Sequence, residues 1–383
     1  MEEFFEWIER LDALDKPSDE RLPPAISVRY QRVAAPTPLD FENSVVRVLG
    51  TERQVDLFGD LPGYLSVLCW ADTSPSGSSD MLRDQQIATG LGGLFTLALD
   101  RRVRVASTEV TVGMESSDIK HFLPSQVNDR ELTGPLPDEP KAQIERLLAR
   151  VMGLPEDDRK TLGAAIELHY AAALLHDVEL NAAYALVVAA LETLSRRYGQ
   201  VAADWTHWEH ADRFDGVFDD LALTADQSER LRAELLHDKH LRLRQGFAAY
   251  ICASLPKEFW NGEMVDYLPT MELDNGGEGG FKALEPSGSI PIRQIVPEDL
   301  DTLRRRLLAA YDARSLYVHA GGKTLDTMSG LKAMIPMPVD RKEPLSFAGM
   351  RRILVAMIHR EIELRTTPRE IPPLRLFHQK SSL

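Results

Sequence analysis

The sequence has few of the residues that a secreted or membrane-embedded protein would need. Only two of its 383 residues are cysteines, Cys69 and Cys252, and they form no metal-binding or disulfide pattern. No run of apolar residues approaches the length of about 18 that a membrane-spanning helix requires. The N-terminus, which begins Met1-Glu2-Glu3, lacks the basic and apolar segments of a signal peptide. We therefore expect a soluble protein of the reducing cytoplasm that has no membrane partner.

Basic residues are also in deficit. The chain has 44 lysines and arginines against 59 aspartates and glutamates, which gives a formal net charge of −15. This balance argues against a basic coat that binds nucleic acid indiscriminately, and it leaves open a local basic groove on an acidic body. A hydrophobic content of 44% and a charged content of 27% are typical of a soluble folded protein, and nothing in the composition indicates overall disorder.

The length predicts two domains, and the patterning predicts a mainly α fold. Residues 1–135 are expected to form a smaller α+β N-terminal domain, with a sensor or regulatory role. Residues 136–370 are expected to form a helical domain, and residues 371–383 a tail with little packing potential. The boundary is indicated by segment 121–140, which contains four prolines among polar residues.

Hydrophobic periodicity locates the elements of both parts. In the first part it predicts helices over 2–14 and 81–99, and strands near 26–28, 45–49, 63–70 and 103–111. In the second part it predicts helices over 142–151, from 155 through 174, 180–198, 241–260 and 351–364. The stretch from Pro269 to Pro291 contains Asn275-Gly276-Gly277-Glu278-Gly279-Gly280 and is predicted to be a flexible insertion.

An unusual chemical pattern lies between Tyr311 and Gly322. Arg314 continues a helical spacing of apolar residues, namely Leu300, Leu303, Leu307 and Ala310. A guanidinium on that buried face needs an acceptor, because leaving it unpaired would cost several kcal/mol. His319 follows, and Gly321-Gly322 predicts a left-handed helix end. On an ideal helix His319 is about 7.5 Å along the axis from Arg314 and about 140° around it, so the two share no single face.

Helix 180–198 offers a partner for this arginine. Its flank of Ala182, Ala185 and Ala189 permits close approach of a neighbouring helix, and Glu192 continues that flank. Glu192 is therefore either a solvated edge residue or the partner of a basic group on the adjacent helix, for which Arg314 is the obvious candidate.

These two segments resemble parts of a known family. Arg314 to His319 resembles the R-x4-6-H motif of HEPN domains, in particular the Y-x-x-R-S-x-x-V-H-G segment of the ApeA-like group. Ala190-Leu191-Glu192-Thr193-Leu194 resembles the A-L-E-x-L helix of that group. The resemblance covers residues 155–365 and implies a C-terminal HEPN-like antiparallel helical bundle. One departure is Ala320, which separates the histidine from the glycines and affects the local helix cap.

The resemblance implies a metal-independent endoribonuclease without a cofactor. RNA cleavage without a metal needs a base, an acid and a cation for the phosphorane. His319 would serve as base or acid, and Arg314 would bind the phosphate with paired donors. A twofold homodimer would bring two histidines to one cleft. Glu192 is a supporting residue, and Ser315 and Tyr317 are candidate helpers through their hydroxyl groups.

The competing interpretation is a non-catalytic HEPN-like module that binds nucleotide or RNA, or that mediates dimerisation and regulates a partner. The presence of both Arg314 and His319 favours catalysis, whereas the acidic net charge favours the module. Locally the segment is basic, since it carries Arg304, Arg305, Arg306 and Lys323 against Asp312. The resemblance further implies an RNA partner and bacterial antiviral defence or a toxin, with a phage-derived or antitoxin-like regulator.

Two other motifs carry weaker signals. His207 with His210 and His237 with His240 form H-x-x-H pairs that resemble zinc ligands, but no cysteine accompanies them, so chance spacing is favoured and no metal is expected. Gly90-Leu91-Gly92-Gly93 resembles a nucleotide-binding loop, but no apolar strand precedes it and no Lys-Ser/Thr follows, so close helix packing is favoured.

Overall fold

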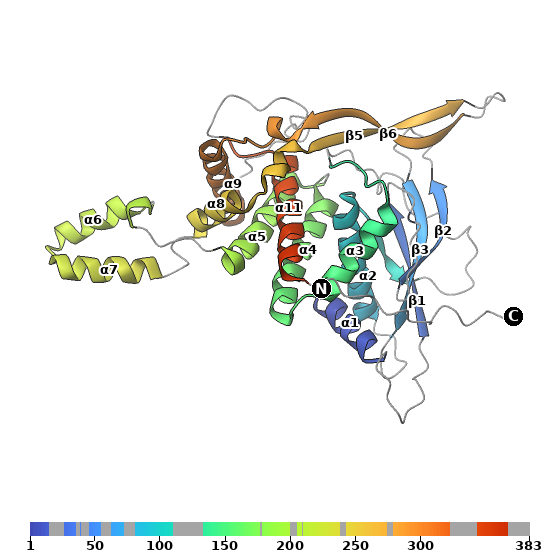
Figure 1. The fold of residues 1–383 in the computed structure, drawn as a ribbon, viewed down its shortest axis with the longest axis horizontal. Coiled ribbons are helices and arrows are strands. Elements are labelled where there is room, and N and C mark those ends of the chain that lie inside the picture. Colours follow the sequence, from blue (N-terminus) through green and yellow to red (C-terminus); the bar gives the residue numbers. More distant parts are fainter. Residues whose placement is uncertain are drawn as a thin grey trace.

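The computed structural model describes thirteen parts of the chain: residues 1–14, 27–35, 39, 46–54, 63–72, 81–109, 133–176, 178–199, 205–208, 210–237, 243–273, 279–321 and 343–366. Within them the chain is mainly helical, with two small antiparallel sheets (Figure 1). Several predictions concern residues outside the described parts, namely those on Gly322, Lys323, His240 and the tail 371–383. Of the helices in the described ranges, none combines the length and apolar character needed to cross a bilayer.

The helices are α1 (Glu2–Leu14), α2 (Met81–Leu99), α3 (Pro140–Met152), α4 (Glu156–Leu175), α5 (Leu180–Tyr198), α6 (Ala211–Asp220), α7 (Ala225–His237), α8 (Leu243–Ser254), α9 (Leu300–Ala320) and α11 (Phe347–Arg365). Three short 3-10 helices are η3 (Trp205–His207), η5 (Lys257–Asn261) and η6 (Ile292–Gln294). The predicted bounds of α1, α2 and α5 are confirmed to the residue. The amphipathic spacing that marks them is a local property of the chain.

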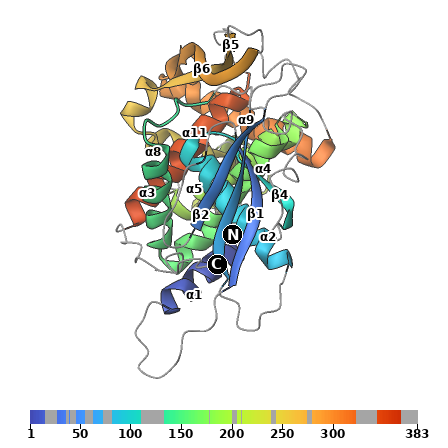
Figure 2. The same cartoon turned by 90° about the vertical axis from the view of Figure 1, so that its right-hand side faces the viewer.

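A four-stranded antiparallel sheet forms in the first part of the chain, in the order β2-β3-β1-β4. Its strands are β1 (Ser27–Ala35), β2 (Val46–Gln54), β3 (Gly63–Asp72) and β4 (Arg104–Glu109). Figure 2 looks onto this sheet, with helices behind it. Leu68 and Trp70 on the central strand β3 are fully buried. The sheet therefore covers α2, which contacts both β1 and β4.

Helix α2 packs unusually closely against its neighbours. A Cβ atom at Gly90 would lie 2.9 Å from Phe4, and one at Gly92 would lie 2.7 Å from Val105 and 2.9 Å from the hydroxyl of Tyr170. These glycines lie inside the helix, so the interpretation of the glycine motif as helix packing is confirmed.

The two parts of the chain share one buried hydrophobic cluster. It runs from Met1 and from Phe4 of α1, through α2 and α4, to Ile358 and Ile362 on α11. Helix α2 contacts both α3 and α4. The proposed boundary near residue 135 stays a prediction, and any domains that it separates are packed against each other over a continuous core.

The helical half is built from α4, α5, α8, α9 and α11, and polar contacts reveal their directions. Tyr198 at the end of α5 bonds to Asp158 at the start of α4, so these two helices are antiparallel. Arg365 at the end of α11 also contacts Asp158, whereas Arg351 near its start contacts His169 late in α4. Helix α11 is therefore antiparallel to α4 as well.

The prediction of a flexible insertion from Pro269 to Pro291 is wrong over the described residues. The chain forms an antiparallel hairpin of β5 (Glu263–Leu273) and β6 (Gly279–Pro291). Figure 1 shows it running from the helices toward the side of the molecule that carries the four-stranded sheet. Prolines and glycines normally weaken a strand, but a two-stranded hairpin leaves one edge of each strand unpaired, where proline is tolerated.

Candidate functional site

The candidate site is built on α9, whose two ends have defined caps. Asp299 caps the start, and its side chain accepts a hydrogen bond of 3.0 Å from the backbone N–H of Thr302. Gly321 ends the helix with a φ of 63°, in the left-handed region that suits glycine. The left-handed stop predicted at Gly321 is confirmed, and His319 belongs to the last helical turn.

One face of α9 is buried in the bundle. Leu303, Leu307 and Ala310 have no exposed surface, as their spacing predicts. The prediction is wrong for Leu300, which is 50% exposed because it is the first residue of the helix. Arg306 is also buried. The apolar spacing alone did not predict this, although Arg306 lies on the same stripe, three residues after Leu303.

Helix α8 fixes the middle of α9. The guanidinium of Arg244 donates two hydrogen bonds of 2.7 Å to the two carboxylate oxygens of Asp312. Beside this pair, the rings of Phe247 and Tyr311 contact each other with centroids 5.6 Å apart. Charged and apolar contacts together place the turn that precedes Arg314.

Arg314 meets the predicted carboxylate. An Nη atom of Arg314 lies 3.5 Å from Oε2 of Glu192 on α5, and the side chains are 23% and 6% exposed. Arg196, one turn further along α5, donates a hydrogen bond of 2.5 Å to Oε1 of Glu192. The Nε of Arg314 is buried and makes no hydrogen bond within the described residues. Glu192 is thus a paired residue rather than a solvated edge residue, and it holds two guanidinium groups.

The surroundings of this ion pair affect a neighbouring phenol. Burial raises the pKa of Tyr311, and the negative charge of Glu192 raises it further, while the charges of Arg314 and Arg196 oppose the rise. Tyr311 therefore stays protonated at neutral pH and lies within the electrostatic influence of the same three charges.

The other predicted site residues lie on the last turns of α9. His319 is exposed, and Ser315 and Tyr317 are partly exposed. Within the described parts of the chain, no hydrogen bond or ion pair joins any of these three side chains to Arg314. One chain therefore brings Arg314 and Glu192 together and leaves His319 separate, as expected for positions five residues apart on a helix.

Two apolar residues of the last turns of α9 are exposed. Leu316 is 47% exposed and Val318 is 52% exposed, whereas Leu303, Leu307 and Ala310 earlier on the helix are buried. On a helical wheel Val318 lies about 40° from Arg314, so it continues the buried stripe past the end of the bundle. The last turns of α9 thus expose Val318, the residue next to His319, on the side of the helix that carries the buried stripe.

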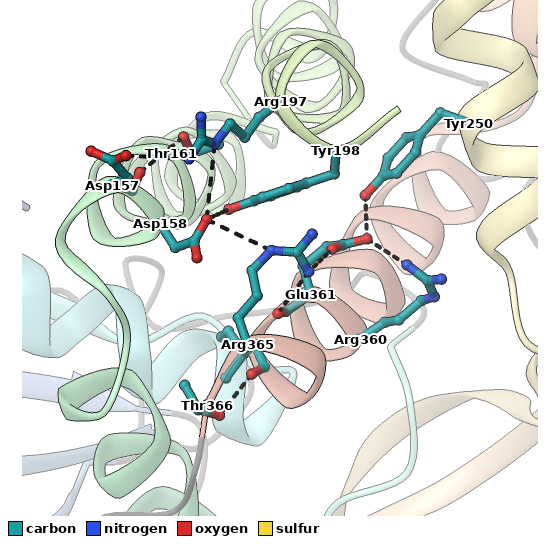
Figure 3. Close-up of polar contacts among 11 residues, drawn as sticks. Asp157, Asp158, Thr161, Arg197, Tyr198, Tyr250, Arg360, Glu361, Arg365 and Thr366 are labelled. Carbon is teal, nitrogen blue, oxygen red and sulfur yellow. Dashed lines mark hydrogen bonds and ion pairs between the residues drawn. The ribbon is translucent and has the colours of Figure 1, made fainter. Parts of the chain in front are cut away.

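A polar network holds the C-terminal end of α5, which carries Glu192 (Figure 3). Glu361 on α11 has no exposed surface, accepts a hydrogen bond of 2.6 Å from Tyr250 and one of 2.5 Å from Arg360, and forms an ion pair with Arg365. The guanidinium of Arg365 in turn lies 3.6 Å from the centre of the Tyr198 ring. The contacts of Glu361 and Arg365 with Tyr250 and Tyr198 therefore connect α11 to α8 and α5, and each buried charge has a partner.

Of the four histidines in these pairs, His210 has a described side chain. Within the described residues, no three side chains of His, Cys, Asp or Glu gather closely enough to hold an ion. The ring of His210 contacts that of Trp208 with centroids 5.5 Å apart. The nearby carboxylate of Asp215 accepts hydrogen bonds from Trp205 and Arg232.

Comparisons of the chain with models of protein families, with curated proteins and with solved structures give no match.

Proposed function

We propose that the chain is a HEPN-type, metal-independent endoribonuclease whose site contains Arg314 and His319. The observation that carries the proposal is the geometry of α9, which combines an arginine oriented by a buried carboxylate with an exposed histidine on its last turn. An oriented guanidinium matches two phosphate oxygens, and an exposed imidazole can exchange protons near neutral pH.

The proposed reaction is an internal transesterification. A neutral His319 takes the proton of the 2′-hydroxyl, whose oxygen attacks the adjacent phosphorus. The bond from phosphorus to the 5′-oxygen breaks, and a protonated histidine gives that oxygen its proton. Arg314 stabilises the charge of the pentavalent phosphorus. The products are a 2′,3′-cyclic phosphate and a 5′-hydroxyl. Ser315 and Tyr317 would contact the phosphate through their hydroxyl groups.

The proposal includes a homodimer, because one chain offers a single histidine for two proton transfers. The exposed side chain of Val318 supports pairing of two α9 helices at their C-terminal ends, because two copies would cover it from water. In such a pair the partner's His319 would face the first chain's site.

The RNA would be reached through the exposed arginines of the same helix. Arg304 and Arg305 are exposed on α9, and the net positive charge there would attract a phosphate backbone to an otherwise acidic protein. The proposal places the protein in the cytoplasm, in antiviral defence or as a toxin, with a regulator of phage or antitoxin type.

One observation favours the alternative of a non-catalytic binding or dimerisation module. Arg314 is already paired with Glu192, and His319 has no contact with it, so the two can have separate structural roles. Expression of wild type beside His319→Ala, with cell growth and total RNA integrity as readouts, separates the two functions. Growth arrest and RNA loss confined to wild type support the nuclease, and identical behaviour supports the module.

A further inference from the structure

A pocket lies on the opposite side of α11 from Glu361 of the polar network. This open pocket has a volume of about 520 Å³ and is lined by the end of α2, residues of segment 135–137, α3 and α11. Its volume falls within the range of about 300–1,000 Å³ that is usual for small-molecule sites. None of its lining residues belongs to the Arg314–Glu192 pair.

Arginines dominate the charged wall of this pocket. Arg146, Arg150 and Arg352 line it, against the carboxylates of Asp100 and Glu363. The carboxylate of Glu363 forms an ion pair with Arg150, with an N–O distance of 2.6 Å. Arg146 is exposed, and it donates a hydrogen bond of 3.0 Å to the neutral side chain of Gln143. This arginine therefore has donors available for an anionic ligand.

Asp100 acts as a fixed internal anion that orients Arg352. Its carboxylate lies 3.2 Å from Arg351 and 3.0 Å from Arg352, and it accepts a bond of 2.6 Å from the backbone N–H of Gly134. Burial alone would raise the pKa of Asp100, but the neighbouring arginines hold it at about 2. The oxygens of Asp100 are thus already used within the protein.

Arg352 is the residue that this arrangement presents to the pocket. Its Nη1 is bound by Asp100, while its Nε is buried and without a hydrogen bond among the described residues. A buried donor of this kind is destabilising unless a partner reaches it. The pocket beside it gives a ligand access to the guanidinium.

The remaining wall is apolar and carries one neutral imidazole. Leu147, Val355 and Ala356 line the pocket, together with His359. A ring nitrogen of His359 lies 3.4 Å from the carbonyl oxygen of Leu97, and burial lowers the pKa of the ring, so it is uncharged at pH 7. The pocket therefore combines a cationic end with an apolar wall.

We propose that this pocket binds a small organic phosphate of the size of a mononucleotide, with its phosphate against Arg146 and Arg352 and its flat apolar part against Val355 and Ala356. A paired guanidinium arrangement matches phosphate oxygens, and the apolar wall distinguishes a nucleotide from a free anion. The ligand would join α2 and α3 to α11.

Calorimetric titration of the full chain tests this assignment with AMP, adenosine, ribose 5-phosphate and inorganic phosphate as probes. We expect AMP to bind most tightly, because it alone of the four probes has both a phosphate for the arginines and a flat base for the apolar wall. Arg146→Glu should weaken AMP binding about tenfold or more, since a charge-assisted contact is lost and reversed. Ala356→Leu, which fills the pocket, should do the same. Lys141→Glu makes the same charge change on α3 outside the pocket and should leave the affinity unaltered.

Arg314→Ala separates this proposal from the nuclease, and it should bind AMP as wild type does. Three results would overturn the pocket assignment: AMP affinity unchanged in both Arg146→Glu and Ala356→Leu, no binding of AMP to wild type at millimolar concentration, or inorganic phosphate binding as tightly as AMP. If the wild type cleaves no RNA, the nuclease proposal fails, but the AMP titrations still test the pocket because they do not depend on cleavage.

Discussion

The guanidinium of Arg314 lies 3.5 Å from the carboxylate of Glu192, which joins the helix of the candidate site to the centre of the bundle. Glu192 is buried and forms ion pairs with both Arg196 and Arg314. Its fixed carboxylate therefore sets the position of the Arg314 guanidinium. In the proposed nuclease, the arginine would thereby be oriented before the phosphate binds, which is the arrangement that electrostatic catalysis requires.

This pair predicts a specific effect of Glu192→Gln. The substitution keeps the size of the side chain and leaves two neighbouring guanidinium groups without a countercharge. We expect the free energy of unfolding to fall by about 1–3 kcal/mol and RNA cleavage to decrease. Urea denaturation and a cleavage assay measure the two effects. Glu229→Gln, on the exposed surface of α7, is the control and should alter neither.

His319→Ala should reduce RNA cleavage by about 10² to 10⁴-fold, since it removes proton transfer without disturbing the fold. Arg314→Ala should also abolish cleavage and, in addition, weaken RNA binding. Cleavage of a labelled oligonucleotide and circular dichroism provide the measurements. His210→Ala, at an exposed histidine outside the site, should remain active. Full activity of the His319→Ala, Arg314→Ala double variant would end the nuclease proposal.

Cleavage is expected to proceed in excess EDTA, because Arg314 and two copies of His319 would supply the cation, the base and the acid. Mass spectrometry of the products should find 2′,3′-cyclic phosphate ends. A strict requirement for Mg²⁺ together with 5′-phosphate ends would point to a different mechanism.

The proposed dimer predicts different outcomes for two exposed apolar residues of α9. Val318→Arg should disrupt self-association and cleavage together, because it places a charge at the exposed apolar residue next to His319. Leu300→Arg makes a similar change at the other end of the same helix and should keep both. Analytical ultracentrifugation measures the association state. A strictly monomeric wild type with undiminished turnover on dilution would contradict the shared cleft.

Mixed dimers give an independent check on the same idea. Chains carrying His319→Ala and chains carrying Arg314→Ala should each be inactive alone. When they are mixed, a composite site can contain one intact arginine and one intact histidine, so partial activity should return. Absence of any recovery, with mixed dimers detected by native mass spectrometry, would count against shared sites.

A buried histidine predicts the pH dependence of stability. His169 has no exposed surface and accepts a hydrogen bond from Arg351, and burial, followed by the charge of Arg351, lowers its pKa to about 3. The unfolded chain binds the proton near pH 6.5, so the free energy of unfolding should fall between pH 6.5 and pH 3. The loss from pH 6.5 to 5 should be about 2 kcal/mol. Urea denaturation should give a flatter profile for His169→Gln, and an equal slope would refute this assignment.

Local sequence patterns were sufficient for much of the fold. The bounds of α2 and α5 follow from their apolar spacing, and the end of α9 follows from Gly321, because helix formation and capping depend on residues within a few positions of each other. The acceptor for Arg314 was also predictable, since a guanidinium on a buried face requires a carboxylate and Glu192 lies on a flank suited to close packing.

The tertiary structure alone decided the features that join distant residues. The contacts of Asp100 with Arg352 and of His169 with Arg351 link α2 and α4 to α11, and no local pattern marks either pair. The hairpin of β5 and β6 was missed because its prolines and glycines suggest a loop, whereas its stability depends on pairing between strands. The sequence by itself thus determined where helices begin and end and which side chains required partners. Packing decided which distant groups met and that Val318, on the apolar stripe of α9, lies exposed beyond the bundle, because burial depends on all the elements at once.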